Sequence, residues 1–303
     1  MGANGAALRF GQNTAGGVTI NYAAMGRKDA PLILMLHGFP EYWAGWRAVM
    51  ERLADSYFVV APDQRGYNRS SKPQGMEHYR AKALAEDVAA LADALSPGKP
   101  FVLAGHDWGA SVAYAYAFAH PERLSHLVIA NGVHPACFQR ALFEDDAQRE
   151  ASRYFHYLIS PKAEQGLSED DYRRLMQMLA SFSETSWLDE EEAAAYRAAW
   201  GEPGALTAML NWYRASPIIV PEAGAPVPPG RSVLDLSAET MRVAMPHLVL
   251  WGEADTALLP SCLEGLDRFA PQLAVRKIPG ASHWILHEKP DDVAAAIAAF
   301  VGG

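Results

Sequence analysis

Cysteine, basic residues and long apolar runs are scarce in this sequence, and each shortage excludes a class of protein. Cys137 and Cys262 are the only 2 cysteines among 303 residues, which excludes a disulfide-rich fold but not a single disulfide. Lysine and arginine number 26 against 35 acidic residues, and the net charge of −9 argues against nucleic acid or an anionic membrane as a partner. No apolar run is long enough to span a membrane. Residues 1–6 contain no basic segment leading into an apolar core, so we expect a cytoplasmic protein without a secretory signal.

Short apolar runs alternate with helical patterns in both end regions of the chain. The runs predicted to be buried strands are 32–36, 57–61, 101–104, 124–130, 247–251 and 274–278, and the alternating segment predicted to be an edge strand is 18–23. Helices are predicted between them, at 46–54, 79–95, 110–118, 263–269 and 291–300. Strands that alternate with helices through short connections indicate an α/β fold with a doubly wound, mostly parallel sheet.

This alternation stops in the middle of the chain. No core strand is predicted there, and helical patterns occupy 138–158, 169–182, 190–200 and 205–215. We therefore predict a helical cap at 133–243, inserted between two parts of one α/β core at 1–132 and 244–303.

The segment Gly105-His-Asp-Trp-Gly109 joins a predicted strand to a predicted helix. Two glycines that flank a central residue at this spacing are typical of a nucleophile elbow, whose usual form is Gly-x-Ser-x-Gly. Asp107 stands at the centre here, and a carboxylate nucleophile attacks an sp³ carbon to form an alkyl ester. The alternative is that Asp107 caps the following helix. No Gly-x-Ser-x-Gly occurs in the chain, which disfavours a serine esterase.

Hydrolysis of such an ester needs a base, and the base needs an acidic partner. His283 follows the last predicted strand and is the favoured base, with His287 as its rival. Asp255 follows the strand 247–251 and is the favoured acid, with Glu253 as its rival. A metal site on the two histidines is discounted, because Trp284 stands where the metalloprotease motif has glutamate.

The tetrahedral intermediate of ester hydrolysis carries an oxyanion that backbone N–H groups stabilise. The N–H that follows the nucleophile, that of Trp108, is one predicted donor. The loop 37–41 follows an earlier strand and supplies the second, with Phe39 as the predicted donor, because Pro40 has no N–H.

Four motifs together resemble those of the α/β-hydrolase-fold epoxide hydrolases, and the resemblance covers nearly the whole chain. They are His37-Gly-Phe-Pro-Glu41, Pro62-Asp-Gln-Arg-Gly-Tyr67, Gly105-His-Asp-Trp-Gly109 and Gly280-x-x-His283. The resemblance implies an α/β-hydrolase fold and an enzyme of detoxification that needs no cofactor and no metal. It implies hydrolysis of a small apolar epoxide to a vicinal diol through an alkyl ester on Asp107. It leaves a homodimer open.

The same family uses two cap tyrosines that hydrogen-bond to the epoxide oxygen. Tyr213, within Leu210-Asn-Trp-Tyr-Arg214, matches the second of these, and Tyr154 matches the first. Tyr157 and His156 are neighbouring alternatives to Tyr154. By this resemblance Tyr154, Tyr213, Phe39 and Trp108 are the residues expected to contact the substrate.

Three other functions stay open. A haloalkane dehalogenase shares the Asp nucleophile and the following Trp, but it usually has Asn where Phe39 stands. A fluoroacetate dehalogenase carries arginines in the region that Trp108 and Ser111 occupy. A non-catalytic relative that binds a ligand under the cap would commonly lack part of the triad, and this chain has all three residues.

Overall fold

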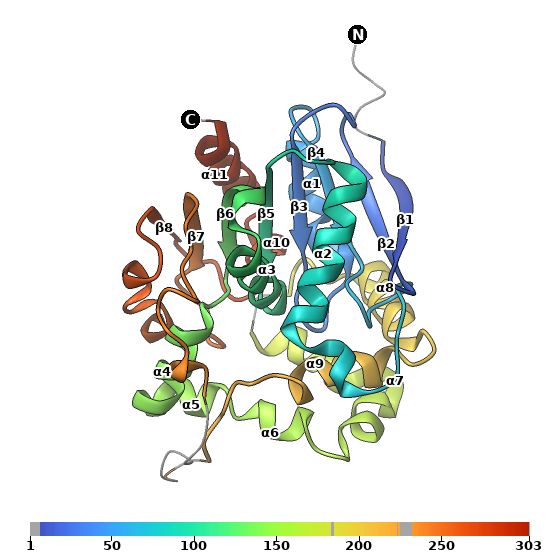
Figure 1. Cartoon of the computed structure of the whole chain (residues 1–303). Coiled ribbons are helices and arrows are strands. Elements are labelled where there is room, and N and C mark those ends of the chain that lie inside the picture. The colour runs from blue at the N-terminus through green and yellow to red at the C-terminus, as the bar shows by residue number, and fades with distance from the viewer. Residues whose placement is uncertain (1–6, 183–184, 223, 225–231, 303) are drawn as a thin grey trace.

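An eight-stranded sheet forms the centre of the molecule (Figure 1) in the computed structural model, which describes residues 7–182, 185–222, 224 and 232–302. The strands are β1 (Arg9–Ala15), β2 (Val18–Met25), β3 (Leu32–Leu36), β4 (Phe58–Pro62), β5 (Phe101–His106), β6 (Leu124–Ala130), β7 (His247–Gly252) and β8 (Leu273–Ile278). β3 and β4 are buried along their whole length, as strands covered on both faces must be. The predicted α/β fold is confirmed.

The direction in which the chain adds strands to the sheet changes at β3. The order is β1-β2-β4-β3-β5-β6-β7-β8, with antiparallel pairing at β1–β2 and β2–β4 and parallel pairing elsewhere. The chain therefore passes from β3 to β4 on one side and later to β5 on the other. Such a switch point opens a crevice at the carboxyl ends of the strands. The loop after β3 and the turn after β5 border that crevice.

Helices cover both faces of the sheet. α2 (Ala81–Leu95) and α3 (Trp108–Ala119) pack on one face, and α1 (Arg47–Leu53), α10 (Ile285–Glu288) and α11 (Pro290–Gly302) pack on the other (Figure 1). Successive strand residues point to opposite faces. Leu34 and Leu36 of β3 thus join the core under α2 and α3, whereas Ile33 and Met35 join the core under α1 and α11.

Among the described residues, six α-helices lie between β6 and β7 in the chain, and Figure 1 shows them gathered at one end of the sheet. They are α4 (Pro135–Glu144), α5 (Asp146–Ala151), α6 (Tyr154–Leu158), α7 (Ala163–Ser181), α8 (Glu190–Gly201) and α9 (Ala205–Arg214). We call this group the cap. No helix in the described ranges combines the length and the apolar character needed to cross a bilayer.

Several predicted elements differ from the structure. The segment 18–23 is not an edge strand, because β1 pairs outside it. The predicted helix 138–158 is three helices, α4 to α6, separated at Asp145 and near Ser152. α7 begins earlier than expected and is interrupted by non-helical backbone at residues 169–172. The predicted helix 263–269 consists of short 3₁₀ turns.

Candidate active site

Asp107 is held in a strained turn at the end of β5. Its φ of 50° and ψ of −120° lie outside the regions that ordinary residues favour. It occupies the N-cap position of α3, yet its side chain makes no capping hydrogen bond. Instead, Oδ1 accepts a hydrogen bond of 2.7 Å from the Phe39 N–H. The capping interpretation is therefore wrong, and the strain presents the carboxylate to the crevice.

Two glycines permit this close packing. A Cβ on Gly109 would lie 2.1 Å from the Leu36 carbonyl oxygen, so any other residue would push α3 away from β3. A Cβ on Gly38 would lie 2.3 Å from Asp107 Oδ1 and would block the carboxylate. Both positions require glycine for steric reasons.

His283 lies between two carboxylates from different strand ends. Its Nδ1 is 2.9 Å from Asp255 Oδ2, and its Nε2 is 3.6 Å from Asp107 Oδ2. Asp255 is itself fixed, since its Oδ1 accepts hydrogen bonds from the N–H groups of Ala257 and Leu258 at 2.8 and 3.0 Å. The order carboxylate, imidazole, carboxylate is that of a nucleophile, a base and an orienting acid.

The two carboxylates control the charge of His283. Burial by itself lowers the pKa of the imidazole, but Asp255 and Asp107 together raise it from 6.5 to about 10. The resting site therefore holds a protonated His283 between two anions. Loss of the Asp107 charge would remove one of the interactions that raise this pKa.

The two predicted oxyanion donors flank the nucleophile. Phe39 follows β3 and already donates its N–H to Asp107 Oδ1. Trp108 follows Asp107 and begins α3, where backbone N–H groups have no partner within the helix. Oδ1 thus lies where a developing oxyanion would be stabilised, and Oδ2 is the oxygen directed toward His283.

The predicted cap tyrosines meet over this turn. Tyr154 begins α6 and Tyr213 lies in α9, with ring centroids 6.3 Å apart. The Tyr213 ring also packs edge-on against Trp108 at 4.9 Å and Phe39 at 5.0 Å. Burial and the charge of Asp107 raise the pKa of both phenols well above the ordinary value. Both hydroxyls are therefore neutral hydrogen-bond donors at physiological pH.

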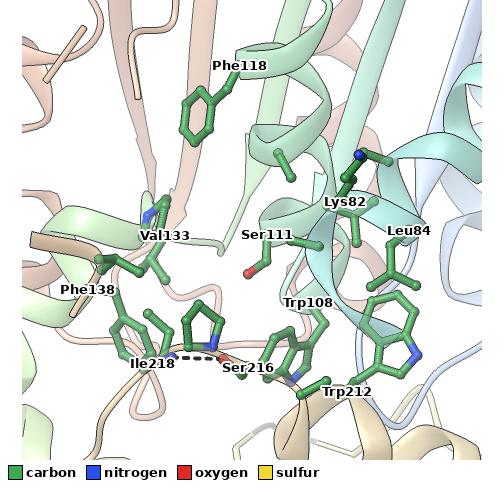
Figure 2. A pocket seen from close by; sticks show the side chains of 18 of the residues that line it. Lys82, Leu84, Trp108, Ser111, Phe118, Val133, Phe138, Trp212, Ser216 and Ile218 are labelled. Carbon is green, nitrogen blue, oxygen red and sulfur yellow. Dashed lines mark hydrogen bonds between the residues drawn. The ribbon is translucent and has the colours of Figure 1, made fainter. Parts of the chain in front are cut away.

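A cavity of about 740 Å³ opens at the nucleophile and extends between the sheet domain and the cap (Figure 2). Among the described residues, its lining includes Asp107, Trp108 and Tyr154 but not Phe39 or Tyr213. Most of the lining is apolar and comes from α2, α3, α4 and the segments 215–218 and 233–241. The cavity fits an apolar small molecule.

The rival residues point elsewhere. His287 Nε2 is 2.8 Å from Glu41 Oε1, and its ring stacks on Trp187. The Tyr157 hydroxyl accepts a hydrogen bond from Arg174 at 2.7 Å. His156 lies 3.6 Å from the carboxylate of Glu222, and Glu253 is exposed.

Neither cysteines nor metal ligands add to the site. Cys137 and Cys262 are buried as free thiols, and burial raises the pKa of both. The described part of the chain contains no group of three side chains placed to hold a metal ion.

The sequence analysis missed a buried network centred on Glu41. This carboxylate is fully buried and lies 2.9 Å from His106 Nδ1, while His106 Nε2 donates to the carbonyl oxygen of His283 at 2.9 Å. His287 at 2.8 Å and the Tyr196 hydroxyl at 3.3 Å complete the contacts of Glu41. Burial alone raises the pKa of Glu41, but its hydrogen bonds with the two histidines hold it below its usual range. The sequence signals were the place of Glu41 at the end of the motif His37-Gly-Phe-Pro-Glu41 and its position in a loop after a buried strand.

Comparison with known proteins agrees with this fold. Residues 31–290 match the family described as alpha/beta hydrolase fold. The AB hydrolase superfamily protein YfhM of Bacillus subtilis is 38% identical, over 90% of this chain and 91% of the relative. Epoxide hydrolase 3 of Xenopus tropicalis is 31% identical, over 94% of this chain and 75% of the relative.

Solved structures agree as well. A structure described under novel epoxide hydrolases from metagenomes of hot environments has a TM-score of 0.88 at 35% identity, covering 97% of this chain and 99% of its own. An epoxide hydrolase of Bacillus megaterium in complex with an inhibitor has a TM-score of 0.85 at 28% identity, covering 97% and 100%.

Proposed function

The chain belongs to the α/β-hydrolase fold family and is a hydrolase, and from this premise we propose that it opens small apolar epoxides to vicinal diols. The observation that carries the proposal is a carboxylate, not a hydroxyl, at the elbow, with His283 and Asp255 on one side and two neutral phenols on the other. Relatives and structural neighbours that are named epoxide hydrolases support it.

The first step forms an ester on Asp107. Oδ2 attacks one epoxide carbon and the C–O bond of the ring breaks, while Oδ1 stays on the Phe39 N–H. The ring oxygen takes the electron pair and then a proton from one of the cap phenols. Two phenol donors, Tyr154 in the cavity lining and Tyr213 beside it, are suited to stabilise the negative charge on this oxygen.

The second step hydrolyses that ester. Because esterification removes the charge of Asp107, the pKa of His283 falls. The proton of His283 passes to the phenolate that protonated the ring oxygen, and the neutral imidazole can then accept a proton from water. The water oxygen adds to the carbonyl carbon of the ester, and the N–H groups of Phe39 and Trp108 stabilise the oxyanion. Collapse breaks the bond between the carbonyl carbon and Oδ2, and the leaving oxygen takes the proton on His283, which releases the diol. The carboxylic acid left on Asp107 then gives its proton to His283, which restores the carboxylate and the protonated imidazole.

The contacts of the site favour epoxide opening over halide release. A haloalkane dehalogenase needs donors that face the departing halide, but the side chain of Phe39 has none. The Trp108 side chain hydrogen-bonds to Tyr213, so its indole N–H already has a partner in the cap. Two phenols beside Asp107 are what a poor alkoxide leaving group requires.

Covalent labelling tests the proposal. We expect a single turnover of styrene oxide in ¹⁸O-water to place label in the side chain of Asp107, because water attacks the ester carbonyl. We expect His283→Gln to form a stable adduct on Asp107, visible in the intact mass, without turnover. Label in the diol alone, or a folded His283→Gln variant that forms no adduct, would contradict the two-step mechanism. Release of halide from haloalkanes with no diol from any epoxide would instead identify a dehalogenase.

The remaining expectations stay predictions. They are the cap boundaries at 133 and 243, a location in the cytoplasm, activity without a cofactor or metal, and the question of a homodimer.

A further inference from the structure

The cavity is much longer than the catalytic residues require. It begins at Asp107 and Tyr154 and continues to Ala119 and His120 at the far end of α3. Figure 2 shows Ser111 part of the way along it, between Trp108 and Phe118. From Trp108 to Ala119 the helix rises by about 16 Å at 1.5 Å per residue. An extended alkyl chain covers this length with about 13 bonds, at about 1.2 Å per bond.

We call the part of the cavity that runs from Asp107 to Ala119 the channel. Small side chains keep it open. α2 contributes Ala81, Ala85 and Ala89 to the lining, at a spacing of four residues. α3 contributes Ser111, Ala115 and Ala119 at the same spacing. Residues four apart lie on one face of a helix, so each helix presents a row of short side chains to the cavity.

Larger apolar side chains close the remaining walls of the channel. They are Phe118, Val133, Phe138 and Ile218, and Figure 2 shows them around the cavity. A wall of this kind holds an apolar chain by burial of its surface, without directional contacts.

The charged side chains that α2 adds to the lining do not select a charge. Lys82 and Glu86 line the cavity one helical turn apart near the start of α2, and both are exposed. Their opposite charges offset each other, so this part of the cavity has no net attraction for an anionic group.

We propose that the preferred substrates are epoxides with an uncharged, extended apolar tail of about ten carbon atoms or more, held between α2 and α3. The epoxide lies at Asp107 and the tail points toward Ala119. Ala85 and Ala115 line the middle of the channel, and their short side chains let the tail pass. This inference rests on the proposed epoxide hydrolysis, because the ring must sit at the nucleophile.

A series of terminal epoxyalkanes from 4 to 14 carbons tests the proposal. Each methylene that enters the channel should raise kcat/KM by up to about fourfold, until the channel is full at about a dozen carbons. Ala115→Leu and Ala85→Leu should each lower kcat/KM for 1,2-epoxydodecane by at least about thirtyfold, with a change below about threefold for 1,2-epoxybutane. Ala94→Leu is the matched control, since Ala94 is exposed on α2 and is not among the lining residues.

Binding of unreactive chains separates this inference from the proposed function. Dodecanamide should raise the Tm of the wild type and of Ala94→Leu, but not of Ala115→Leu, whereas butanamide should raise none. Dodecanoate should bind no more tightly than dodecanamide. If kcat/KM does not change with chain length while 1,2-epoxybutane is turned over well, the proposal of a tail channel is wrong and the proposed epoxide hydrolysis stands. If binding depends on chain length but no epoxide is turned over, the proposed tail channel stands and the proposed epoxide hydrolysis is wrong. Tenfold tighter binding of dodecanoate would overturn the choice of an uncharged tail.

Discussion

The sheet and the cap approach Asp107 from opposite sides and hold their side chains in different ways. On the sheet side, hydrogen bonds from backbone N–H groups fix Asp107 and Asp255, and the groups are charged. On the cap side, Tyr154 and Tyr213 are placed by contacts with other aromatic rings and stay neutral. In the proposed mechanism the sheet side therefore supplies the reactive groups, whereas the cap supplies the proton donors. A substitution on the sheet side should lower the catalytic rate more than one on the cap side, and its effect should depend less on the substrate.

Removal of the nucleophile gives the largest expected effect. Asp107→Ala should lower turnover of epoxides by about 10⁵-fold or more, because no other group in the site can form the ester. The intact mass should show no adduct after incubation with styrene oxide. Activity within a hundredfold of wild type, with the fold verified by circular dichroism, would contradict the role of Asp107 as the nucleophile.

Loss of the orienting acid should be nearly as severe, but confined to the second step. Asp255→Asn removes the carboxylate that orients His283 and raises its pKa. Ester hydrolysis should slow by about 10³- to 10⁴-fold, while alkylation slows by less than about tenfold. Rapid-quench mass spectrometry of the alkyl-enzyme measures both steps. Glu253→Gln, an exposed neighbour, is the control and should change neither.

The cap side should give a smaller effect that depends on the leaving group. Tyr154→Phe and Tyr213→Phe should each slow alkylation by epoxides about a hundredfold, at the low end for one lost donor because the second phenol remains. The double variant should be nearly inactive. Tyr157→Phe is the control, since that hydroxyl bonds to Arg174. A double variant that opens epoxides at the wild-type rate would show that the cap donates no proton.

The smallest effect concerns stability. The pKa of His283 is about 10 in the folded chain against an ordinary 6.5, so its bound proton adds stability that is complete below pH 6.5 and is lost as the pH rises through 10. The advantage of wild type over His283→Gln in the free energy of unfolding should fall by at most about 1.4 kcal/mol per pH unit in this window. Urea unfolding at pH 6, 8 and 10 measures it. A difference that is constant across the window would mean that His283 is neutral in the resting site.

The two sides also differ in how well the sequence predicts them. Asp107, Asp255 and His283 each follow a strand, and parallel strands bring their carboxyl ends to one edge, so chain order and spacing suffice to place them together. No comparable rule predicts which residues of the cap lie close together. Tyr154 and Tyr157 are three residues apart in one short helix, and only the packing of α6 against α9 turns one toward Tyr213 and leaves the other with Arg174.

The remaining errors have a similar physical origin. β1 is an exposed, polar edge strand that is visible only through its pairing with β2. The break of 138–158 into three helices follows from loop geometry at Asp145, whose side chain caps α5. The motif His37-Gly-Phe-Pro-Glu41 contains Glu41 but does not indicate its partners, because they come from distant parts of the chain.

Glu41 has a consequence for how the molecule opens. Its partner Tyr196 lies 155 residues away on helix α8 of the cap, and its partner His287 lies 246 residues away on α10. Through Tyr196, Glu41 joins α8 to the core that contains the sheet. If α8 were to detach, the carboxylate would lose a hydrogen bond while it remained in a dry interior, and such a loss is costly. The cap and the sheet should therefore unfold as one cooperative unit at α8. In hydrogen exchange, the amides of α8 should be the last of the cap to exchange with solvent.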